Sequence, residues 1–225
     1  MTLTPPIRLR PADAVPRVAL AVVSAAALAL LAGVSAAAIR QFLLGAEVGG
    51  PDRDIAAWLH AFAGATTMTF LIGVTYLHGT VGILVLTAVA AAVVRHLDPP
   101  YPWPWPFLAV PAVLLLNTAI KQAVERPRPQ WGYALQTLQT SSFPSGHTAC
   151  ATVFYGVLLG WAWSHWRGAA ARAAWLFGAV GAVLLVATSR IALGEHYFSD
   201  CVAALLEGLL WLAICWPRSA ARTLP

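Results

Sequence analysis

Three short segments of the chain concentrate residue types that could bind and transfer a phosphoryl group. The first segment, 121–129, is KQAVERPRP, the second, 144–147, is PSGH, and the third, 189–200, is SRIALGEHYFSD. All three lie beside apolar stretches, where an ionisable side chain is costly unless it is paired or has a function. The candidate residues in them are three bases, two histidines and one carboxylate: Lys121, Arg128, Arg190, His147, His196 and Asp200.

The three bases could together hold an anion that bears two or more negative charges. Arg128 and Arg190 each offer a planar fork of N–H donors to phosphate oxygens, and Lys121 adds a compact point charge. Taken singly, each base could instead be an interfacial charge that extends toward lipid head groups. We interpret three other arginines in this second way, namely Arg40, Arg53 and Arg126.

The histidines and the carboxylate suggest nucleophilic and acid–base chemistry. His196 and Asp200 are four residues apart, which on a helix places them on one face. A carboxylate bonded to one imidazole nitrogen fixes the tautomer and leaves the other nitrogen as a free lone pair. Ser145 and Gly146 precede His147 at the predicted start of a helix, where unpaired N–H groups bind anions and glycine permits close approach. Each feature alone could also be an ordinary polar pair or a simple capped helix.

The composition places these segments in a membrane protein. Of the 225 residues, 59% are hydrophobic and only 10% are charged, whereas a soluble domain carries about 25% charged residues. A disordered chain is excluded by the same values, since such chains are polar and rich in charge. The formal net charge is +5, but Lys occurs once and the bases form no dense cluster, so no nucleic-acid partner is expected. The three cysteines have no metal-binding spacing and are interpreted as packing residues.

The apolar segments predict an all-α integral membrane protein, a bundle of six transmembrane helices that forms one domain over residues 1–225. A spanning helix needs about 20 apolar residues. Segment 55–94 could cross once, after an interfacial helix near Ile55–Phe62, or twice. A single crossing puts most Lys and Arg on the side of both termini, which are then cytoplasmic, and the three segments face outward. The predicted spans are 18–39, one helix within 55–94, 107–120, 147–163, 173–188 and 202–216.

The three segments resemble the three-part signature of the type 2 phosphatidic acid phosphatase and vanadium haloperoxidase superfamily. Residues 121–129 match K-x6-R-P, residues 144–147 match P-S-G-H, and residues 189–200 match S-R-x5-H-x3-D. Order and spacing agree at every defining position. One block alone is a weak signal, whereas three jointly spaced blocks are a specific one.

The resemblance implies a phosphatase that needs no metal or cofactor and works through a phosphohistidine. In this family pattern His196 attacks phosphorus, Asp200 orients His196, and His147 protonates the leaving oxygen. The remaining signature residues hold the phosphoryl oxygens: Lys121, Arg128, Ser145, Gly146 and Arg190. A two-metal centre would require several carboxylates around the ions, and few carboxylates lie near these segments.

A catalytic face at the outer surface of a bilayer suits a lipid phosphate whose tail stays in the membrane. Undecaprenyl pyrophosphate in a bacterial plasma membrane is the predicted substrate. It is a lipid carrier that is released on the outer face of the membrane, and a site on that face suits its recycling. Phosphatidic acid and phosphatidylglycerol phosphate are close alternatives. An anion-binding transporter also stays open, although the sequence has no convincing inverted repeat. A haloperoxidase is disfavoured, because those family members are soluble and bind vanadate. The sequence makes no prediction of oligomeric state.

Overall fold

The computed structural model describes residues 50–98, 105–130 and 140–215, and within these ranges every regular element is an α-helix. The prediction of an all-α chain is confirmed for this part of the molecule. The helices are α2 (Gly50–Phe62), α3 (Ala65–Leu77), α4 (Thr80–Leu97), α5 (Trp105–Val124), α6 (Gly146–His165), α7 (Ala169–Ala192) and α8 (Phe198–Cys215).

Four of the described helices, α4, α5, α7 and α8, are long and apolar enough to cross a membrane. Helices α2 and α3 form a pair bent by 117°, which would be a fifth span if the pair crosses as one unit. Each of the five predicted spans within the described ranges coincides with a helix. The first predicted span, 18–39, lies outside the described residues, so the count of six and the side of the termini stay predictions.

Segment 55–94 holds more helices than predicted. The expected interfacial helix is α2, which begins at Gly50 rather than Ile55, and a second short helix, α3, precedes α4. Within this segment α4 is the helix that qualifies as a span on its own. Two glycines, Gly64 and Gly79, precede α3 and α4 in extended conformation and separate the three helices.

Helix α6 forms the buried centre of the bundle. It contacts α4, α5, α7 and α8, and ten of its side chains are buried. Although we predict a span here, α6 is not among the four helices that qualify by composition. Because protein rather than lipid surrounds it, α6 can carry buried threonines such as Thr152, whose hydroxyl donates to the Thr148 carbonyl at 2.8 Å.

Helix α8 packs against α6 at very short range. A Cβ atom at Gly208 would lie 2.6 Å from the Cβ atom of Thr152, so the two backbones can approach this closely only with glycine there. Small residues that allow such an approach are a common device of helix packing in membranes. The starts of the two helices are also neighbours, since the Ser145 amide donates to the Asp200 carbonyl at 3.2 Å and Asp200 belongs to the third signature segment.

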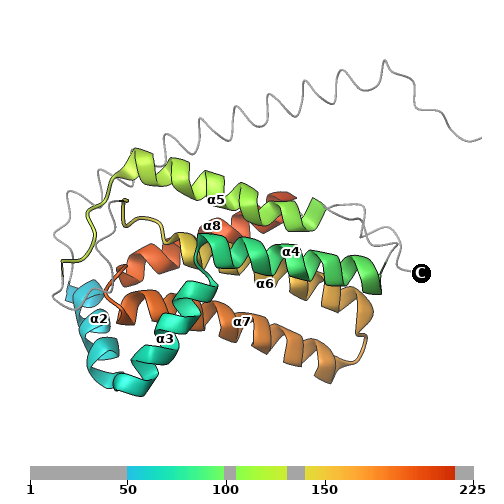
Figure 1. Ribbon diagram of the computed structural model, residues 1–225, viewed down its shortest axis with the longest axis horizontal. Helices are drawn as coiled ribbons and strands as arrows, with labels where there is room; N and C mark the ends of the chain where they lie inside the picture. The colour runs from blue at the N-terminus through green and yellow to red at the C-terminus, as the bar shows by residue number, and fades with distance from the viewer. Residues whose placement is uncertain (1–49, 99–104, 131–139, 216–225) are drawn as a thin grey trace, which may run out of the picture.

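The signature segments meet at one end of the bundle. Figure 1 shows α5 and α7 ending where α6 and α8 begin, with α2 and α3 at the same end. Helix α2 packs against α7 and α8, and α3 packs against α7 and α4. Residues that are far apart in sequence are therefore neighbours in space at this end.

Candidate active site

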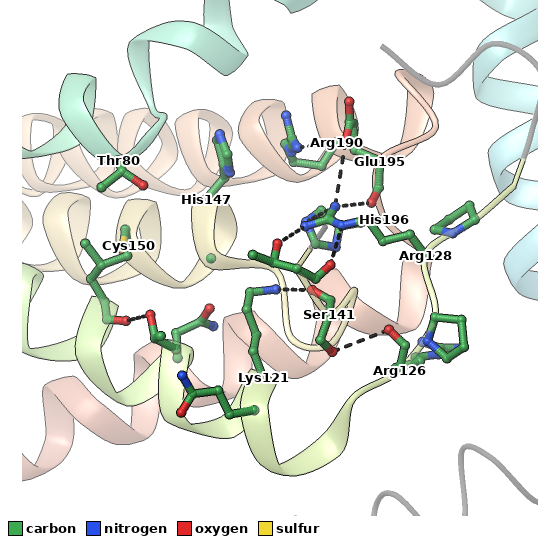
Figure 2. A pocket seen from close by; sticks show the side chains of 18 of the residues that line it. Thr80, Lys121, Arg126, Arg128, Ser141, His147, Cys150, Arg190, Glu195 and His196 are labelled. Atoms are coloured by element: carbon green, nitrogen blue, oxygen red, sulfur yellow. Dashed lines mark hydrogen bonds and ion pairs between the residues drawn. The ribbon is translucent and has the colours of Figure 1, made fainter. Parts of the chain in front are cut away.

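A cavity of about 1190 Å³ opens among these helix ends. Its wall includes residues from all three signature segments and from the turn between α3 and α4 (Figure 2). Eight site residues are predicted, and six of them line the cavity: Lys121, Arg128, Gly146, His147, Arg190 and His196. The other two, Ser145 and Asp200, are fully buried behind the wall.

His196 lies in the connection between α7 and α8 and not on a helix. A spacing of four residues places two side chains on one face only where both residues are helical; α8 begins at Phe198, so only Asp200 is helical. Gly194, with a φ of 73°, reverses the chain after α7, a conformation that glycine adopts without strain. The amides of Glu195 and His196 then both donate to the Arg190 carbonyl, at 3.0 and 3.2 Å.

The imidazole of His196 has a different environment at each nitrogen. Nδ1 lies 3.5 Å from Asp200 Oδ2, and Nε2 lies 3.5 Å from Arg128 Nη1 in the cavity. Burial lowers the pKa of His196 to about 3, although the hydrogen bond with Asp200 acts in the opposite direction. The ring is therefore neutral near pH 7. With Nδ1–H directed at the carboxylate, Nε2 presents a lone pair to the cavity.

Asp200 is held by three groups besides His196. Its Oδ1 accepts a hydrogen bond from Arg126 Nη1 at 2.5 Å. Its Oδ2 accepts one from the Ser142 hydroxyl at 2.5 Å and one from the Tyr197 amide at 3.0 Å. These bonds fix the carboxylate, and through it the orientation of the imidazole.

Our interpretation of Arg126 as an interfacial charge is wrong. Arg126 is 4% exposed and is paired with Asp200, and its guanidinium lies 4.2 Å from the ring centroid of Tyr197. One signal could have indicated this role. A carboxylate beside an apolar helix needs a cationic partner, and Arg126 lies in the same signature segment as Arg128.

Two of the predicted phosphate-binding bases are anchored by the segment that precedes α6. Lys121, in the last turn of α5, donates from Nζ to the Ser141 carbonyl at 2.7 Å. Arg128 donates from Nε to the Thr140 carbonyl at 2.8 Å and from Nη2 to the Thr140 hydroxyl at 3.0 Å. Both side chains line the cavity, and Figure 2 shows them in the same part of its wall as His196.

Arg190, the third base, is 2% exposed and stands at the end of α7. Its Nη1 donates to the Thr75 hydroxyl at 3.3 Å. Its Nη2 lies 3.6 Å from Glu195 Oε2, and the same oxygen lies 3.7 Å from Arg128 Nη1. Glu195, which the sequence analysis does not include in the site, is thus a buried carboxylate close to two of the cations, and its negative charge offsets part of their mutual repulsion.

Ser145 occupies the N-cap position of α6, as predicted, but its side chain makes no capping bond. Its hydroxyl accepts a hydrogen bond from the Thr148 hydroxyl at 3.1 Å. Its amide donates to the Asp200 carbonyl at 3.2 Å. In this arrangement Ser145 joins the start of α6 to the start of α8 and does not face the cavity.

Gly146 and His147 form the part of the wall that α6 contributes. A Cβ atom at Gly146 would lie 3.1 Å from Asn117 Oδ1, so a larger residue would crowd the wall. A Cβ atom at Gly79 would lie 3.7 Å from His147 Nε2. The turn between α3 and α4 therefore covers the imidazole of His147 on one side.

Comparisons with known proteins agree with the signature segments. The family model described as the PAP2 superfamily matches residues 104–224. Phosphatidylglycerophosphatase B of Bacillus subtilis (strain 168) is 27% identical over 139 residues, which are 61% of this chain and 68% of that protein.

Two solved structures share the fold. The crystal structure of a transmembrane PAP2 type phosphatidylglycerolphosphate phosphatase from Bacillus subtilis matches with a TM-score of 0.67 and 24% identity, over 85% of this chain and 97% of that one. The crystal structure of Aquifex aeolicus LpxE matches with a TM-score of 0.59 and 21% identity, over 75% and 96%. Because the family model covers more than half of the chain, the resemblance seen in the three signature segments is confirmed, and the chain belongs to the PAP2 superfamily.

Proposed function

We propose that the chain is a membrane phosphatase that hydrolyses a lipid phosphate or pyrophosphate through a phosphohistidine intermediate. The observation that carries this proposal is the arrangement at one cavity of a neutral histidine backed by a carboxylate, a second histidine and three cations. Membership of the PAP2 superfamily and the phosphatase name of the Bacillus subtilis relative support it.

In the first step His196 Nε2 attacks phosphorus. An N–P bond forms and the bond from phosphorus to the leaving oxygen breaks. Asp200 stabilises the positive charge that develops on the imidazole, as the carboxylate does in a Ser-His-Asp triad. His147, which the negative charge of the bound phosphoryl group favours in its protonated form, donates a proton to the leaving oxygen.

In the second step water attacks the phosphohistidine. His147, now neutral, takes a proton from the water, the N–P bond breaks, and inorganic phosphate leaves. Throughout both steps Lys121, Arg128 and Arg190 stabilise the charge on the phosphoryl oxygens, which is the main task in phosphoryl transfer. The Gly146 amide at the start of α6 adds a donor of the kind that binds phosphate at helix N-termini.

The residues that line the cavity support a lipid substrate. Besides the charged residues, its wall includes apolar side chains from three helices, among them Ile83 of α4, Leu114 of α5 and Cys150 of α6. These helices include two of the four candidate spans. The phosphate head group of a lipid can thus bind among the charged residues, while the lipid tail extends along the apolar side chains between the helices.

The topology and the substrate are proposed from the sequence. The chain is proposed to be one domain with six spans and cytoplasmic termini, and its site faces outward from a bacterial plasma membrane. Undecaprenyl pyrophosphate suits such a site. The name of the curated relative favours a second candidate, phosphatidylglycerol phosphate.

A phosphate-release assay on purified protein tests the reaction and the preference together. The panel would include undecaprenyl pyrophosphate, phosphatidylglycerol phosphate, phosphatidic acid and a water-soluble phosphate ester. We expect release from the lipid phosphates at higher kcat/KM than from the soluble ester. Binding of these lipids without any phosphate release would contradict the proposal and favour an anion-binding protein.

The proposed mechanism also predicts that activity does not depend on a metal ion. Among the residues that the structure describes, no group of three or more His, Cys, Asp and Glu is placed to hold one. We expect the purified enzyme to keep its kcat after dialysis against millimolar EDTA, and vanadate to inhibit it because vanadate adopts five-coordinate geometry. Loss of activity in EDTA that magnesium restores would contradict this mechanism.

A further inference from the structure

We propose that Asp52, which lies in α2 outside all three signature segments, is a positioning residue for the nucleophilic histidine. It acts on His196 through Arg126 and Asp200. This inference rests on the proposed function, because it assigns Asp52 to the support of the group that attacks phosphorus. It concerns a part of the chain that precedes the region matched by the family model.

A single guanidinium joins the two carboxylates. Arg126 Nη2 lies 3.1 Å from Asp52 Oδ2, and Arg126 Nη1 lies 2.5 Å from Asp200 Oδ1. The three side chains are 4%, 12% and 0% exposed for Arg126, Asp52 and Asp200. Because the guanidinium is planar and rigid, a bond to each end fixes its orientation.

Asp52 also holds the first turn of α8 from a different helix. Its Oδ1 accepts a hydrogen bond from the Ser199 amide at 2.8 Å, and its Oδ2 accepts one from the Ser199 hydroxyl at 2.6 Å. The Ser199 hydroxyl in turn accepts a hydrogen bond from Arg126 Nη1 at 2.9 Å. A carboxylate is favourable at a helix N-terminus, and this one fixes the residue directly before Asp200.

The consequence for His196 follows from competition for Asp200. His196 Nδ1 is 3.5 Å from Asp200 Oδ2, which is a long contact, whereas the bond from Arg126 to Asp200 is short. Asp52 binds Arg126 Nη2, so Arg126 cannot donate from both of its terminal nitrogens to Asp200. Without Asp52, Arg126 can turn toward Asp200 and draw the carboxylate away from the imidazole.

Asp54 provides a matched control for this role. It lies two residues from Asp52 on the same helix and carries the same side chain, but it is exposed to solvent. Asp52→Asn and Asp54→Asn therefore make the same chemical change, and only the first removes a charge from the Arg126 pair.

The experiment compares these two variants with the wild-type enzyme, all as purified full chains, on a lipid phosphate that the wild type hydrolyses. For Asp52→Asn we expect kcat to fall by about tenfold or more, the usual cost of losing an outer hydrogen-bond partner. The KM and the inhibition constant of inorganic phosphate should stay within about twofold, because Lys121, Arg128 and Arg190 are untouched. Asp54→Asn should match the wild type.

A double-mutant cycle with Arg126→Gln tests the route. If Asp52 acts through Arg126, the double variant should be no slower than Arg126→Gln alone. Additive losses would overturn the proposed route. A wild-type kcat in folded Asp52→Asn would overturn the inference. A fall in kcat with an equal loss of phosphate binding would also overturn it, because it would show that the whole site, and not only His196, has lost its structure.

Asp52→Glu keeps the inference testable if Asp52→Asn does not fold. It retains the charge but shifts it by one methylene, so we expect a lower kcat with unchanged KM. A wild-type kcat in this variant would overturn the inference. A wild-type enzyme that releases no phosphate from any lipid phosphate would contradict the proposed function itself, and this inference with it.

Discussion

Replacing His196 with asparagine is expected to lower the rate of phosphate release by at least about 10⁴-fold, the scale seen when a covalent nucleophile is removed. Asparagine keeps a polar group of similar size in the buried position but cannot form a phosphoenzyme. Because the cations are unchanged, binding of inorganic phosphate should persist. The measurement is kcat together with the inhibition constant of phosphate.

His165 provides the control for this variant. It is paired with Asp98, with its Nε2 3.2 Å from Oδ2, and it lies at the other end of α6. His165→Asn removes a histidine from a His–Asp pair that is remote from the cavity and should leave kcat unchanged. A His196→Asn enzyme that retains more than a few per cent of wild-type turnover would rule out His196 as the nucleophile.

Replacing His147 with asparagine is expected to produce a loss that depends on the leaving group. A general acid contributes about 10²- to 10⁴-fold, and it is needed most when the leaving oxygen is a poor leaving group. We expect a loss near the top of that range for an alkyl lipid phosphate and a much smaller loss for p-nitrophenyl phosphate, whose phenolate leaves without a proton. The ratio of the two losses is the measurement.

A third histidine of the cavity, His78, separates this effect from general damage. His78 also lines the cavity, but its Nδ1 is 2.9 Å from the Val74 carbonyl oxygen and its Nε2 is 2.9 Å from the Tyr155 hydroxyl. Any loss in His78→Asn should therefore be the same for both substrates. Equal losses for both substrates in His147→Asn would contradict its assignment as the acid.

The sequence was sufficient to predict the all-α architecture and five of the ionisable residues that line the cavity, although not Glu195 or the role of Arg126. Apolar segments locate membrane helices well, because each must satisfy its own backbone in lipid. The signature spacing then identified Lys121, Arg128, His147, Arg190 and His196, all of which line the cavity. What placed them together was the alternation of helix directions, which puts the end of one helix beside the start of the next.

The supporting contacts could not be predicted, because they join distant parts of the chain. Asp52 and Arg126 are 74 residues apart, and Asp52 and Ser199 are 147 residues apart. No local pattern marks such pairs, and an arginine near a membrane surface is usually an interfacial charge. The spacing of His196 and Asp200 likewise could not show which of the two residues is helical. Spacing alone does not show where a helix begins, and Gly194 turns the chain just before His196.

Trapping of the phosphoenzyme tests whether His196 is the nucleophile. Wild-type enzyme and a radiolabelled lipid phosphate would be mixed and quenched in alkali within one turnover, and the labelled residue identified by mass spectrometry. We expect a phosphoryl group on His196 that is stable in alkali and lost in acid, and that is absent in the His196→Asn variant. Turnover without any labelled enzyme, or a label on another residue, would contradict it.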